Sequence, residues 1–507
     1  MNSRFTLLFL CFCLLVTRTS ARAAEKASPP RIDVILWFDT EDYLLPASDD
    51  AAKRVADMLR ERGIRATFKI VGEKARTLER RGRKDVIAAL KKHCVAFHSN
   101  FHSVHPTPSE YLKDAGFLDG VAEFVRREGP GAADVRRILG VKTLACYGQP
   151  GSSWAAQAVA GLDQIGVAPS GVACYVDEGD HVGLNNKPFW YANALNVYHM
   201  GQNYTRMDLH DPLAVEPAKH KVSAIASRLA RQDGGGLISI FYHPCEWVHQ
   251  EFWDGVNFAR GNNPPRSEWK APAQRTSEET EGAFKRFGEY VDHIRKIPGV
   301  RFITAEELPG IYPDRIRTEG ANPEELSEIA KAITASGNNT LDFITRGNKS
   351  FSVADQFELL VEALAQDPTT QKKKTLSCHG LFGPDAACPS ASQSREISMP
   401  AFRQAVTDAR QFVHTQGRVP SRVFIGPDPV APGDFLAAMA AVYLTSAETQ
   451  SSVTLPVGRT LLPARQIAED TPKLFGGWIT HRENFQAPRL LEIARLQAWS
   501  LKPALKK

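Results

Sequence analysis

Strand-like apolar runs alternate with helix-like segments through a little over half of the chain, and this alternation limits the fold more than any other feature. Residues 31–38 (RIDVILWF) predict a strand, residues 49–62 a helix and residues 64–72 (IRATFKIVG) the next strand. The pattern continues to a helix at 283–297 and a strand at 300–308. Repeated strand–helix units are typical of a parallel sheet or barrel covered by helices, and about 280 residues suit a (β/α) barrel.

The composition changes beyond this region, where helix-like segments dominate. Residues 315–323 are mostly polar and include Gly320 and Pro323, so we interpret them as a linker. A chain of 507 residues exceeds what one ordinary hydrophobic core supports. We therefore expect an α/β domain over residues 28–314 and a smaller, mainly helical domain over residues 324–507.

The first 23 residues have the features of a signal peptide. Arg4 supplies a positive charge, residues 7–16 form an unbroken apolar run, and residues 21–23 (ARA) are suited to cleavage. The apolar run is shorter than the roughly 20 residues that a membrane-spanning helix needs. We therefore expect residues 1–23 to be removed and the protein to be secreted or periplasmic, without a membrane span.

The net charge and the cysteine content argue against two kinds of binding, namely nucleic-acid binding and a structural zinc site. A net charge of +5, without a dense Lys/Arg run, gives no basis for nucleic-acid binding. The six cysteines beyond the signal peptide contain no CxxC pair, so a structural zinc site is not expected. Cys378 and Cys388 bracket a Gly/Pro-containing loop and are candidates for a disulfide in an oxidising compartment.

Titratable side chains follow several of the predicted strands at their carboxyl ends. The first strand is followed by Asp39, Glu41 and Asp42. A later strand leads into the stretch HSNFH (98–102), and another ends at His243. Ligand sites of barrels and open α/β sheets lie at the carboxyl ends of the strands. We therefore expect these side chains to converge on one site.

Two histidines and acids in this setting predict a catalytic metal site. His98 and His102 are four residues apart, so both can face one ion if the stretch forms a helical turn. A carboxylate from the first strand would complete three protein ligands and leave open positions, and zinc suits this donor set best. A bound ion would acidify a water molecule and polarise a carbonyl group. A second carboxylate would then serve as base, and a separate histidine would protonate the leaving group.

The region from about residue 31 to residue 313 resembles the polysaccharide deacetylases of carbohydrate esterase family four. The resemblance implies a distorted (β/α) barrel that removes N- or O-acetyl groups from sugars with a divalent metal, usually zinc. The stretch FDTED is similar to the first motif of the family. By this resemblance Asp39 is the catalytic base and Glu41 a metal ligand, with Asp42 as the alternative ligand.

Two further motifs carry the resemblance. The stretch from His98 to His102 matches the pattern H-[ST]-x-x-H fully, which implies that both histidines are metal ligands. The sequence IFYH, which ends at His243, is loosely similar to the motif that carries the general-acid histidine.

The third motif of the family departs from the pattern. In the stretch CYGQPG, Gly148 occupies the place of an arginine that orients the base, so orientation has to come from elsewhere or activity on the usual substrates is reduced. The resemblance implies substrate binding around Tyr147, Pro150 and Trp154, and it implies a backbone N–H near Tyr147 that assists the oxyanion. The two aromatic rings are equally well explained as core residues.

The C-terminal region contains a weak internal repeat, because residues 325–364 can be set against residues 402–444. Within the second copy, Gly417, Val423 and Phe435 resemble positions of a pseudomurein-binding repeat, a small module that attaches enzymes to cell-wall polymer. This resemblance implies cell-wall binding; a helical domain that only packs or mediates oligomers is the alternative.

Together these features predict an exported, metal-dependent deacetylase that acts on a cell-wall or extracellular polysaccharide. One alternative is a non-catalytic glycan-binding protein that retains the barrel, which the glycine at position 148 favours. A second alternative is a metal-dependent hydrolase of another amide, such as a cyclic imide or a peptide.

Overall fold

The computed structural model describes most of the chain beyond the N-terminal segment. The described residues are 31–507 apart from 169–170, 178–180, 199–200, 233, 336–338, 367–373, 392 and 446–449. The predicted signal peptide, residues 1–23, lies outside the described residues. Among the described helices, none combines the length and the apolar character that crossing a lipid bilayer requires.

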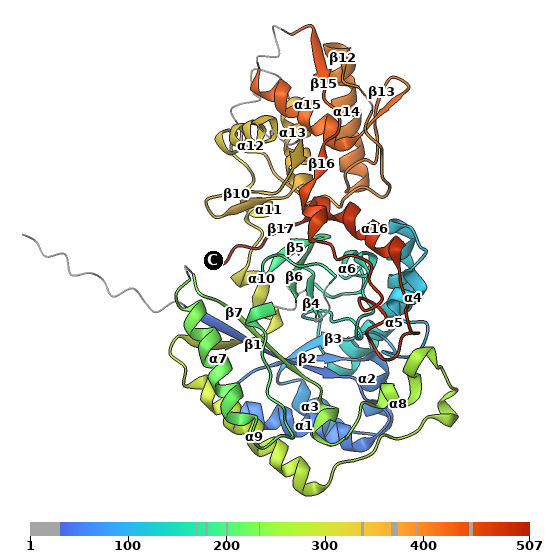
Figure 1. The fold of residues 1–507 in the computed structure, drawn as a ribbon, viewed down its shortest axis with the longest axis vertical. Helices are drawn as coiled ribbons and strands as arrows, with labels where there is room; N and C mark the ends of the chain where they lie inside the picture. The colour runs from blue at the N-terminus through green and yellow to red at the C-terminus, as the bar shows by residue number, and fades with distance from the viewer. Residues whose placement is uncertain are drawn as a thin grey trace, which may run out of the picture.

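A row of parallel strands forms the centre of the N-terminal half (Figure 1). β1 (Ile32–Thr40) pairs with β7 (Gly236–Tyr242) on one side. On the other side, β8 (Val300–Ile303) lies along its first part and β2 (Thr67–Ile70) along its second part. β3 (Cys94–Phe97) continues the row beside β2. All nine residues of β1 are buried, as expected for a parallel strand that is covered on both faces.

The row continues beyond β3 through single residue pairs. Phe97 pairs with Tyr147, and Tyr147 pairs with Tyr175. The strands that follow are β4 (Cys174–Asp177), β6 (Ala194–Tyr198), β5 (Phe189–Tyr191) and β17 (Lys502–Pro503). The pairings confirm the predicted α/β class with a parallel sheet. No strand pair between described residues joins the two ends of the row, so closure into a barrel stays a prediction.

Helices cover the sheet because each buries an apolar face. In α1 (Pro46–Glu61), Ala52, Val55 and Leu59 are buried and recur at helical spacing. The other long helices of this half are α5 (Phe117–Leu139), α7 (Val215–Leu229) and α9 (Ser277–Arg295). The shorter ones are α2 (Gly72–Arg80), α3 (Lys84–Leu90), α4 (Pro108–Leu112), α6 (Ala156–Ala160), α8 (Trp253–Phe258) and α10 (Leu308–Ile311). The sequence pattern did not predict α5, because glycine and proline interrupt its middle at residues 129–131.

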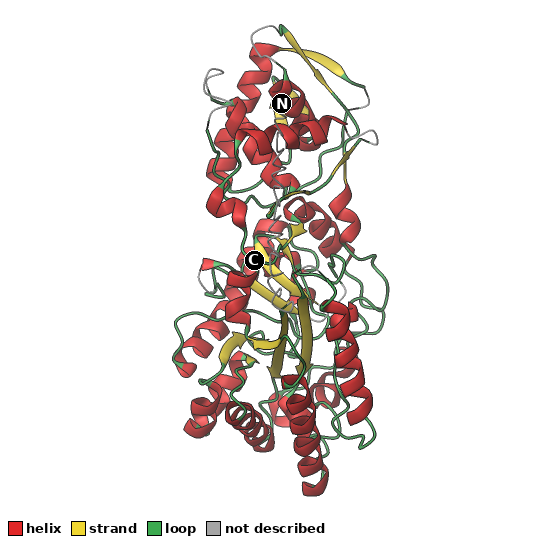
Figure 2. Cartoon of the chain, turned by 90° about the vertical axis from the view of Figure 1, so that its left-hand side faces the viewer, coloured by secondary structure: helices red, strands yellow, loops and turns green. Residues whose placement is uncertain are grey.

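A second group of helices and small strand pairs lies above the sheet in Figure 2. In chain order its main elements are α12 (Pro323–Ala335), β10 (Ile344–Arg346), β11 (Lys349–Phe351), α13 (Val353–Leu364), α14 (Met399–Gln416), β13 (Val423–Ile425), β14 (Asp428–Val430) and α15 (Pro432–Leu444). Two further pairs are β12 (Arg395–Ser398) with β15 (Ser452–Leu455), and β9 (Thr340–Leu341) with β16 (Thr460–Leu461). The predicted linker contains a short helix, α11 (Arg315–Glu319).

The order helix, hairpin, helix occurs twice in this group, as the internal repeat in the sequence suggests. α12, β10–β11 and α13 form the first copy, and α14, β13–β14 and α15 form the second. Phe357 and Phe435 lie in the first two turns of α13 and α15, and their ring centroids lie 6.5 Å apart.

The end of the chain returns to the N-terminal half. α16 (Pro488–Gln497) buries Leu490, Leu491 and Ile493 in the same core as β1 and α1. β17 pairs with β5 at the edge of the strand row. In Figure 1 the red loop before α16 runs down beside α5. The sequence-based boundaries placed these residues in a C-terminal domain over 324–507, whereas their apolar side chains pack into the core of the first half.

The cysteine thiols outside the N-terminal segment are free in this structure. Cys378 is buried, and its Sγ donates to the Glu358 carboxylate at 3.1 Å. The disulfide with Cys388 that the sequence suggested is therefore not formed, because the Cys378 thiol points into a buried polar cluster.

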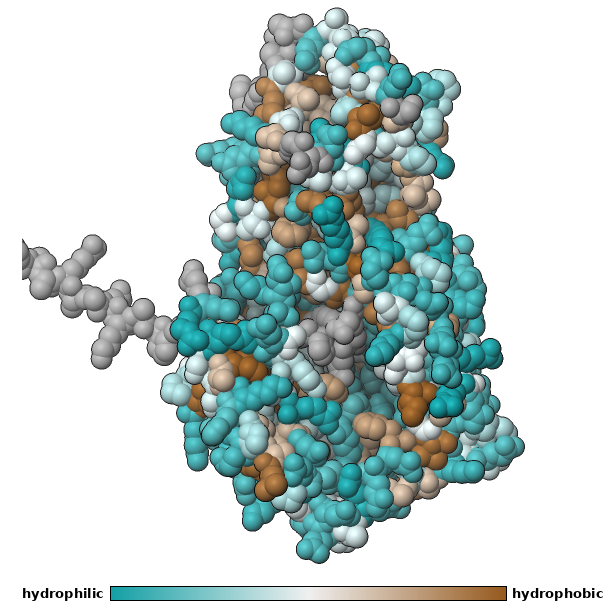
Figure 3. Space-filling view, in the orientation of Figure 1, coloured by the Kyte–Doolittle hydropathy of each residue, from teal (hydrophilic) through white to brown (hydrophobic). Residues whose placement is uncertain are grey.

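On the face drawn in Figure 3, apolar residues form separate patches among hydrophilic ones. Among the residues that the structure describes, the large apolar side chains with the greatest exposure are Leu213, Phe424 and Ile479, and they come from distant parts of the sequence. Isolated apolar side chains are normal on a folded protein, so they do not mark a docking surface.

Candidate metal centre

Asp39 of β1 and Glu41, which directly follows β1, face both histidines of the HSNFH stretch at the carboxyl end of the sheet. Asp39 and Glu41 are two residues apart, and side chains at that spacing lie on the same side of an extended backbone. Glu41 Oε2 lies 2.9 Å from His102 Nε2 and 3.6 Å from His98 Nε2. The candidate ligand atoms of Glu41, His98 and His102 all lie within 4.8 Å of one another, and all three residues are buried. The structure therefore brings these three side chains together.

The HSNFH stretch does not form the helical turn expected from its spacing. β3 ends at Phe97, and Ser99 and His102 adopt left-handed backbone conformations with φ of 64° and 57°. The His102 N–H donates to Ser99 Oγ at 3.0 Å and closes the loop. The rings of His98 and His102 still approach to a centroid distance of 4.9 Å. The expectation of a helical turn was wrong because two left-handed residues, rather than helix geometry, fold the stretch back on itself.

Both imidazoles are held by their Nδ1 atoms. His98 Nδ1 lies 2.9 Å from the Gly148 carbonyl oxygen, and because a carbonyl oxygen only accepts, Nδ1 carries the hydrogen. His102 Nδ1 lies 2.6 Å from Ser103 Oγ, whose own hydrogen goes to Asp254 Oδ2 at 3.2 Å. In both rings Nε2 is then left with its lone pair. Partners of this kind fix the orientation of metal-binding histidines.

This donor set fits a divalent cation. Burial lowers the pKa of His98, and it lowers the pKa of His102 to about 4, so both rings are neutral at neutral pH. The carboxylate oxygen of Glu41 and the lone pair of His102 Nε2 are both acceptors, and acceptors 2.9 Å apart repel unless a positive charge lies between them. Imidazole nitrogen and carboxylate oxygen are ligands that zinc takes at about 2.0–2.2 Å.

Asp39 lies beside the candidate ligands and is held by a lysine. Its Oδ1 lies 2.7 Å from Lys69 Nζ of β2, and its Oδ2 lies 3.6 Å from His243 Nε2 and 3.9 Å from His98 Nε2. Burial acts to raise the pKa of Asp39, but the positive charges of Lys69 and His243 act against burial and hold the pKa at about 2. Asp39 is therefore an ionised carboxylate with one oxygen fixed and the other directed into the site.

His243 follows β7 and lies on the opposite side of Asp39 from Lys69. Its Nδ1 lies 2.6 Å from Glu246 Oε1, and Glu246 also forms an ion pair with Arg206. Burial acts to lower the pKa of His243, but the carboxylates of Glu41 and Glu246 raise it to about 10. His243 is therefore a protonated imidazolium that points Nε2 into the site.

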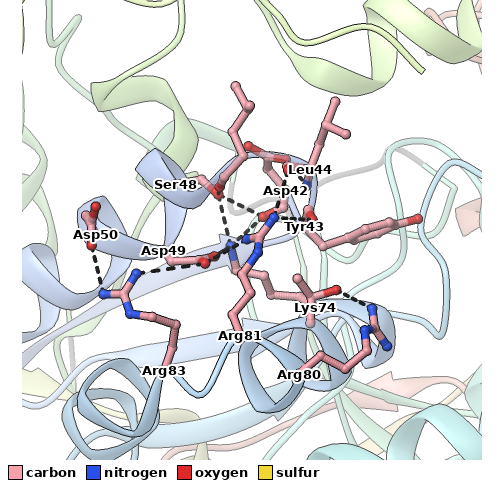
Figure 4. A network of polar contacts seen from close by, with 12 residues as sticks. Asp42, Tyr43, Leu44, Ser48, Asp49, Asp50, Lys74, Arg80, Arg81 and Arg83 are labelled. Carbon is pink, nitrogen blue, oxygen red and sulfur yellow. Dashed lines mark hydrogen bonds and ion pairs between the residues drawn. The ribbon is translucent and has the colours of Figure 1, made fainter. Parts of the chain in front are cut away.

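The alternative acid, Asp42, is not part of the group that Glu41 forms with His98 and His102, and its Oδ2 lies 3.4 Å from a different histidine, His249. Asp42 Oδ1 accepts the Leu44 N–H at 2.7 Å, and its backbone carbonyl accepts from Lys74 (Figure 4). The Lys74 ammonium also lies 2.5 Å from Asp49 Oδ1, and Asp49 accepts from Arg81 at 2.7 Å. This buried network holds the turn between β1 and α1, so Asp42 belongs to the scaffold and the acid at the site is its neighbour at position 41.

The three predicted substrate-binding residues are buried. Tyr147 is 0% exposed and Trp154 3% exposed, and Pro150 is buried as well. The Trp154 ring stacks on His181, and the Tyr147 N–H donates to the Cys174 carbonyl within the sheet. The burial of both rings favours the alternative that they are core residues, because a sugar subsite needs an accessible ring face. Binding of the oxyanion by another N–H near Tyr147 stays a prediction.

One side of the site is built by a residue that the sequence motifs did not reveal. The Trp478 ring lies edge-on to the His102 ring, with the centroids 5.7 Å apart. It also covers Gly151, where an added Cβ would lie 2.3 Å from the indole. His481, in the same segment, lies 3.1 Å from Thr107 Oγ1. These contacts join residues that are far apart in the chain, and no local pattern predicts them.

Lys69 was also missed. It lies in an apolar strand, TFKI, where a lysine is most simply explained by exposure at a sheet edge. Its 1% exposure and its ion pair with Asp39 become visible only when β1 and β2 are placed side by side.

No family model and no curated relative matches the sequence. Solved structures that align with it include the carbohydrate esterase family four domain of a multidomain xylanase from the hindgut metagenome of Trinervitermes trinervoides, with 13% identity over 56% of this chain and 93% of that chain and a TM-score of 0.28. A putative polysaccharide deacetylase from Mycobacterium smegmatis aligns with 12% identity over 56% of this chain and 91% of that chain, and a TM-score of 0.34.

The family 4 carbohydrate esterase from Streptomyces lividans, solved in complex with acetate, aligns with 16% identity over 53% of this chain and 89% of that chain, and a TM-score of 0.26. Similarities at this level do not assign an activity to this chain. Its function has to be inferred from the geometry of the site itself.

Proposed function

We propose that this chain is a metal-dependent deacetylase that hydrolyses acetyl groups on a polysaccharide. The observation that carries the proposal is the convergence of Glu41, His98 and His102, with both Nε2 lone pairs directed at one point. Asp39 and His243 flank that point with opposite charge. An ionised base and a protonated acid on either side of a Lewis-acid site are the groups that hydrolysis of an acetyl amide or ester needs.

Each of these side chains has a separate role in the proposed hydrolysis. Zinc bound to the three ligands would supply Lewis acidity, which acidifies water and polarises the acetyl carbonyl. Asp39 accepts a proton from the attacking water on Oδ2, the oxygen that faces the site. His243 donates the proton on Nε2 to the departing amine or alkoxide, and Glu246 holds its ring through Nδ1 at 2.6 Å.

Space for a substrate adjoins the acid side of the site. A cavity of about 340 Å³ is lined in part by Arg206, Glu246 and Phe252. The exposed Phe252 ring stands edge-on to His243, with the centroids 4.8 Å apart. An apolar ring and an arginine beside the acid suit a polar glycan chain that is held partly through its apolar C–H faces.

We further propose that the protein acts outside the cytoplasm on a cell-wall or extracellular polymer. The apolar run at residues 7–16 supports export, and the repeated helix–hairpin–helix unit supports attachment to a cell-wall polymer by the C-terminal region. Zinc is the proposed physiological ion because the donor set contains two imidazoles and one carboxylate.

The test compares metal content and acetate release in matched variants. His98→Ala is expected to lose bound zinc and all measurable acetate release from chitooligosaccharide and peptidoglycan. His105→Ala is the control, because His105 follows the HSNFH stretch by three residues but pairs with Glu110 at 2.6 Å. It should keep both properties. Wild-type protein that binds no more zinc than His98→Ala would end the proposal.

A second variant separates catalysis from glycan binding. Asp39→Asn keeps the size of the base but cannot accept the proton, so acetate release should fall by about 10²–10⁴-fold. Zinc content and glycan binding should persist. If glycan is bound but wild type releases acetate from no acetylated substrate, so that Asp39→Asn changes no rate, the protein is a non-catalytic glycan binder.

A further inference from the structure

Lys69 is a buried lysine whose ammonium faces the candidate base. In the register of the two parallel strands, Lys69 of β2 lies directly beside Asp39 of β1. The residue is 1% exposed, and Nζ lies 2.7 Å from Asp39 Oδ1. The other oxygen, Oδ2, is the one that faces His243. The ammonium therefore fixes one oxygen of the carboxylate and leaves the other directed into the site.

Gly148 provides the space that this lysine occupies. A Cβ added at position 148 would lie 2.5 Å from Lys69 Nζ and 2.6 Å from its Cδ. The backbone of Gly148 does not have a positive φ, so glycine is needed here for space and not for its conformation. The same residue presents its carbonyl oxygen to His98 Nδ1 at 2.9 Å. Gly148 thus accepts a hydrogen bond from the candidate ligand His98 through its carbonyl oxygen, and its lack of a side chain leaves room for Lys69.

We propose that Lys69 is the positioning residue for the base Asp39 and takes the place of a cation at position 148. This inference rests on the proposed function, since it assigns how the base of that reaction is held. A charged side chain from position 148 would have to cross the volume that Lys69 now fills, so the two arrangements exclude each other. In this arrangement the cation that orients the base comes from β2, the strand beside β1, and not from the loop that contains Gly148.

Lys74 provides a matched control for a merely structural role. It is also 1% exposed, and its Nζ lies 2.5 Å from a buried carboxylate, that of Asp49. It holds the turn after β1, where its ammonium donates to the Asp42 carbonyl oxygen (Figure 4). Removal of either ammonium takes one cation away from a buried carboxylate and costs stability, although Asp49 keeps Arg81 at 2.7 Å and Asp39 keeps His243 at 3.6 Å. Only the removal of Lys69 should change the chemical step.

The experiment measures kcat, KM and zinc content of Lys69→Met and Lys74→Met on an acetylated chitooligosaccharide. Lys69→Met should lower kcat by about 10²-fold, in the range expected for a misplaced base, with KM and zinc content unchanged. Lys74→Met should keep kcat where it folds. A kcat for Lys69→Met within threefold of wild type, with zinc retained, would overturn the role.

Two further variants decide the question if Lys69→Met does not fold. Gly148→Ala keeps the lysine but pushes Nζ from its place, so kcat should fall at least tenfold; wild-type kcat with zinc bound would overturn the proposal. Lys69→Ala opens a cavity that ethylammonium can enter, so added ethylammonium should restore part of kcat, whereas tetramethylammonium at equal ionic strength should not.

The failure of this proposal can be told apart from the failure of the proposed function. If the wild-type protein with zinc releases no acetate, the deacetylase function fails and the role of Lys69 falls with it. If wild type is active and Lys69→Met is equally active, the deacetylase function stands and only the role of Lys69 is lost.

Discussion

The HSNFH loop and the segment around Trp478 lie on adjoining sides of the same site, yet they reach it by different routes. The loop follows β3 directly, and its two rings are placed by a few local hydrogen bonds. The Trp478 segment arrives from the far end of the chain, after the polypeptide has passed through the whole helical group. A site built this way has one part that a motif describes and another that depends on the complete fold.

The end of the chain is part of the hydrophobic core of the N-terminal half and does not form a separate unit. Apolar side chains of α16 and of the preceding loop pack in the same cluster as β1 and α1. Burying a leucine-sized side chain stabilises the fold by about 1.5–3 kcal/mol, so several such residues together approach the whole stability of a domain.

The largest expected effect is that of truncation after Leu461. The shortened chain exposes the core that α16 covers, so it should be insoluble or lack near-UV circular dichroism. Removal of residues 505–507 alone is the control and should leave a folded protein. A soluble, cooperatively folded product of truncation after Leu461 would show that the first half does not need the returning segment.

A smaller effect is expected from single leucine substitutions, one in the returning segment and one in the N-terminal half. Leu491→Ala in α16 and Leu90→Ala in α3 each remove a fully buried leucine from the same core. Each should lower the free energy of unfolding by about 2–5 kcal/mol, and both should shift the same thermal transition in calorimetry. Two separate transitions, with each variant shifting only one, would mean that the returning segment forms its own folding unit.

Gly151→Ala tests the contact between the segment around Trp478 and the candidate metal centre. Gly151 has φ of 48°, and its Cβ would collide with Trp478. The control is Gly63→Ala, which has φ of 70° but open space around the added methyl. Backbone strain costs about 1–2 kcal/mol at both positions, and only Gly151→Ala should add about 1–3 kcal/mol for overpacking. If both variants lose the same free energy of unfolding in chemical denaturation, Trp478 does not contact Gly151.

The smallest effect concerns the support of the HSNFH loop by α5. Glu128 accepts the Asn100 N–H at 2.6 Å and the Tyr111 hydroxyl at 3.1 Å, and burial raises the pKa of Glu128 to about 7 from 4.5. A folded-state pKa above the unfolded value contributes stability that is lost as pH rises from 4.5 through 7. The free energy of unfolding, measured in urea, should therefore fall less over this pH range for Glu128→Gln than for wild type. Parallel pH profiles for the two proteins would contradict this assignment.

Residues placed by local sequence were largely foreseen. The strands that end at Thr40, Phe97 and Tyr242 were predicted from apolar runs. The acids and histidines at their ends were singled out because ligand sites lie at the carboxyl ends of strands. The choice between Glu41 and Asp42 stayed open, because only the turn held by Lys74 shows which acid faces the rings.

The remaining features depend on tertiary placement. Tyr147 and Trp154 were equally consistent with a sugar subsite and with a core, because an aromatic side chain suits both and its sequence position does not show its burial. Lys69 and Trp478 carry no motif, since one acts across a strand pair and the other across the length of the chain. The helical turn expected for HSNFH failed because spacing alone does not reveal left-handed residues such as Ser99.

The central claim is that Glu41, His98 and His102 hold one divalent ion. Anomalous diffraction at the zinc absorption edge, on crystals of the wild-type protein grown with zinc, tests it most directly. The account predicts a single strong peak about 2.0–2.2 Å from Glu41 Oε2 and from both Nε2 atoms, and no such peak in His98→Ala. Zinc density elsewhere, with these three side chains bound only to one another, would contradict it.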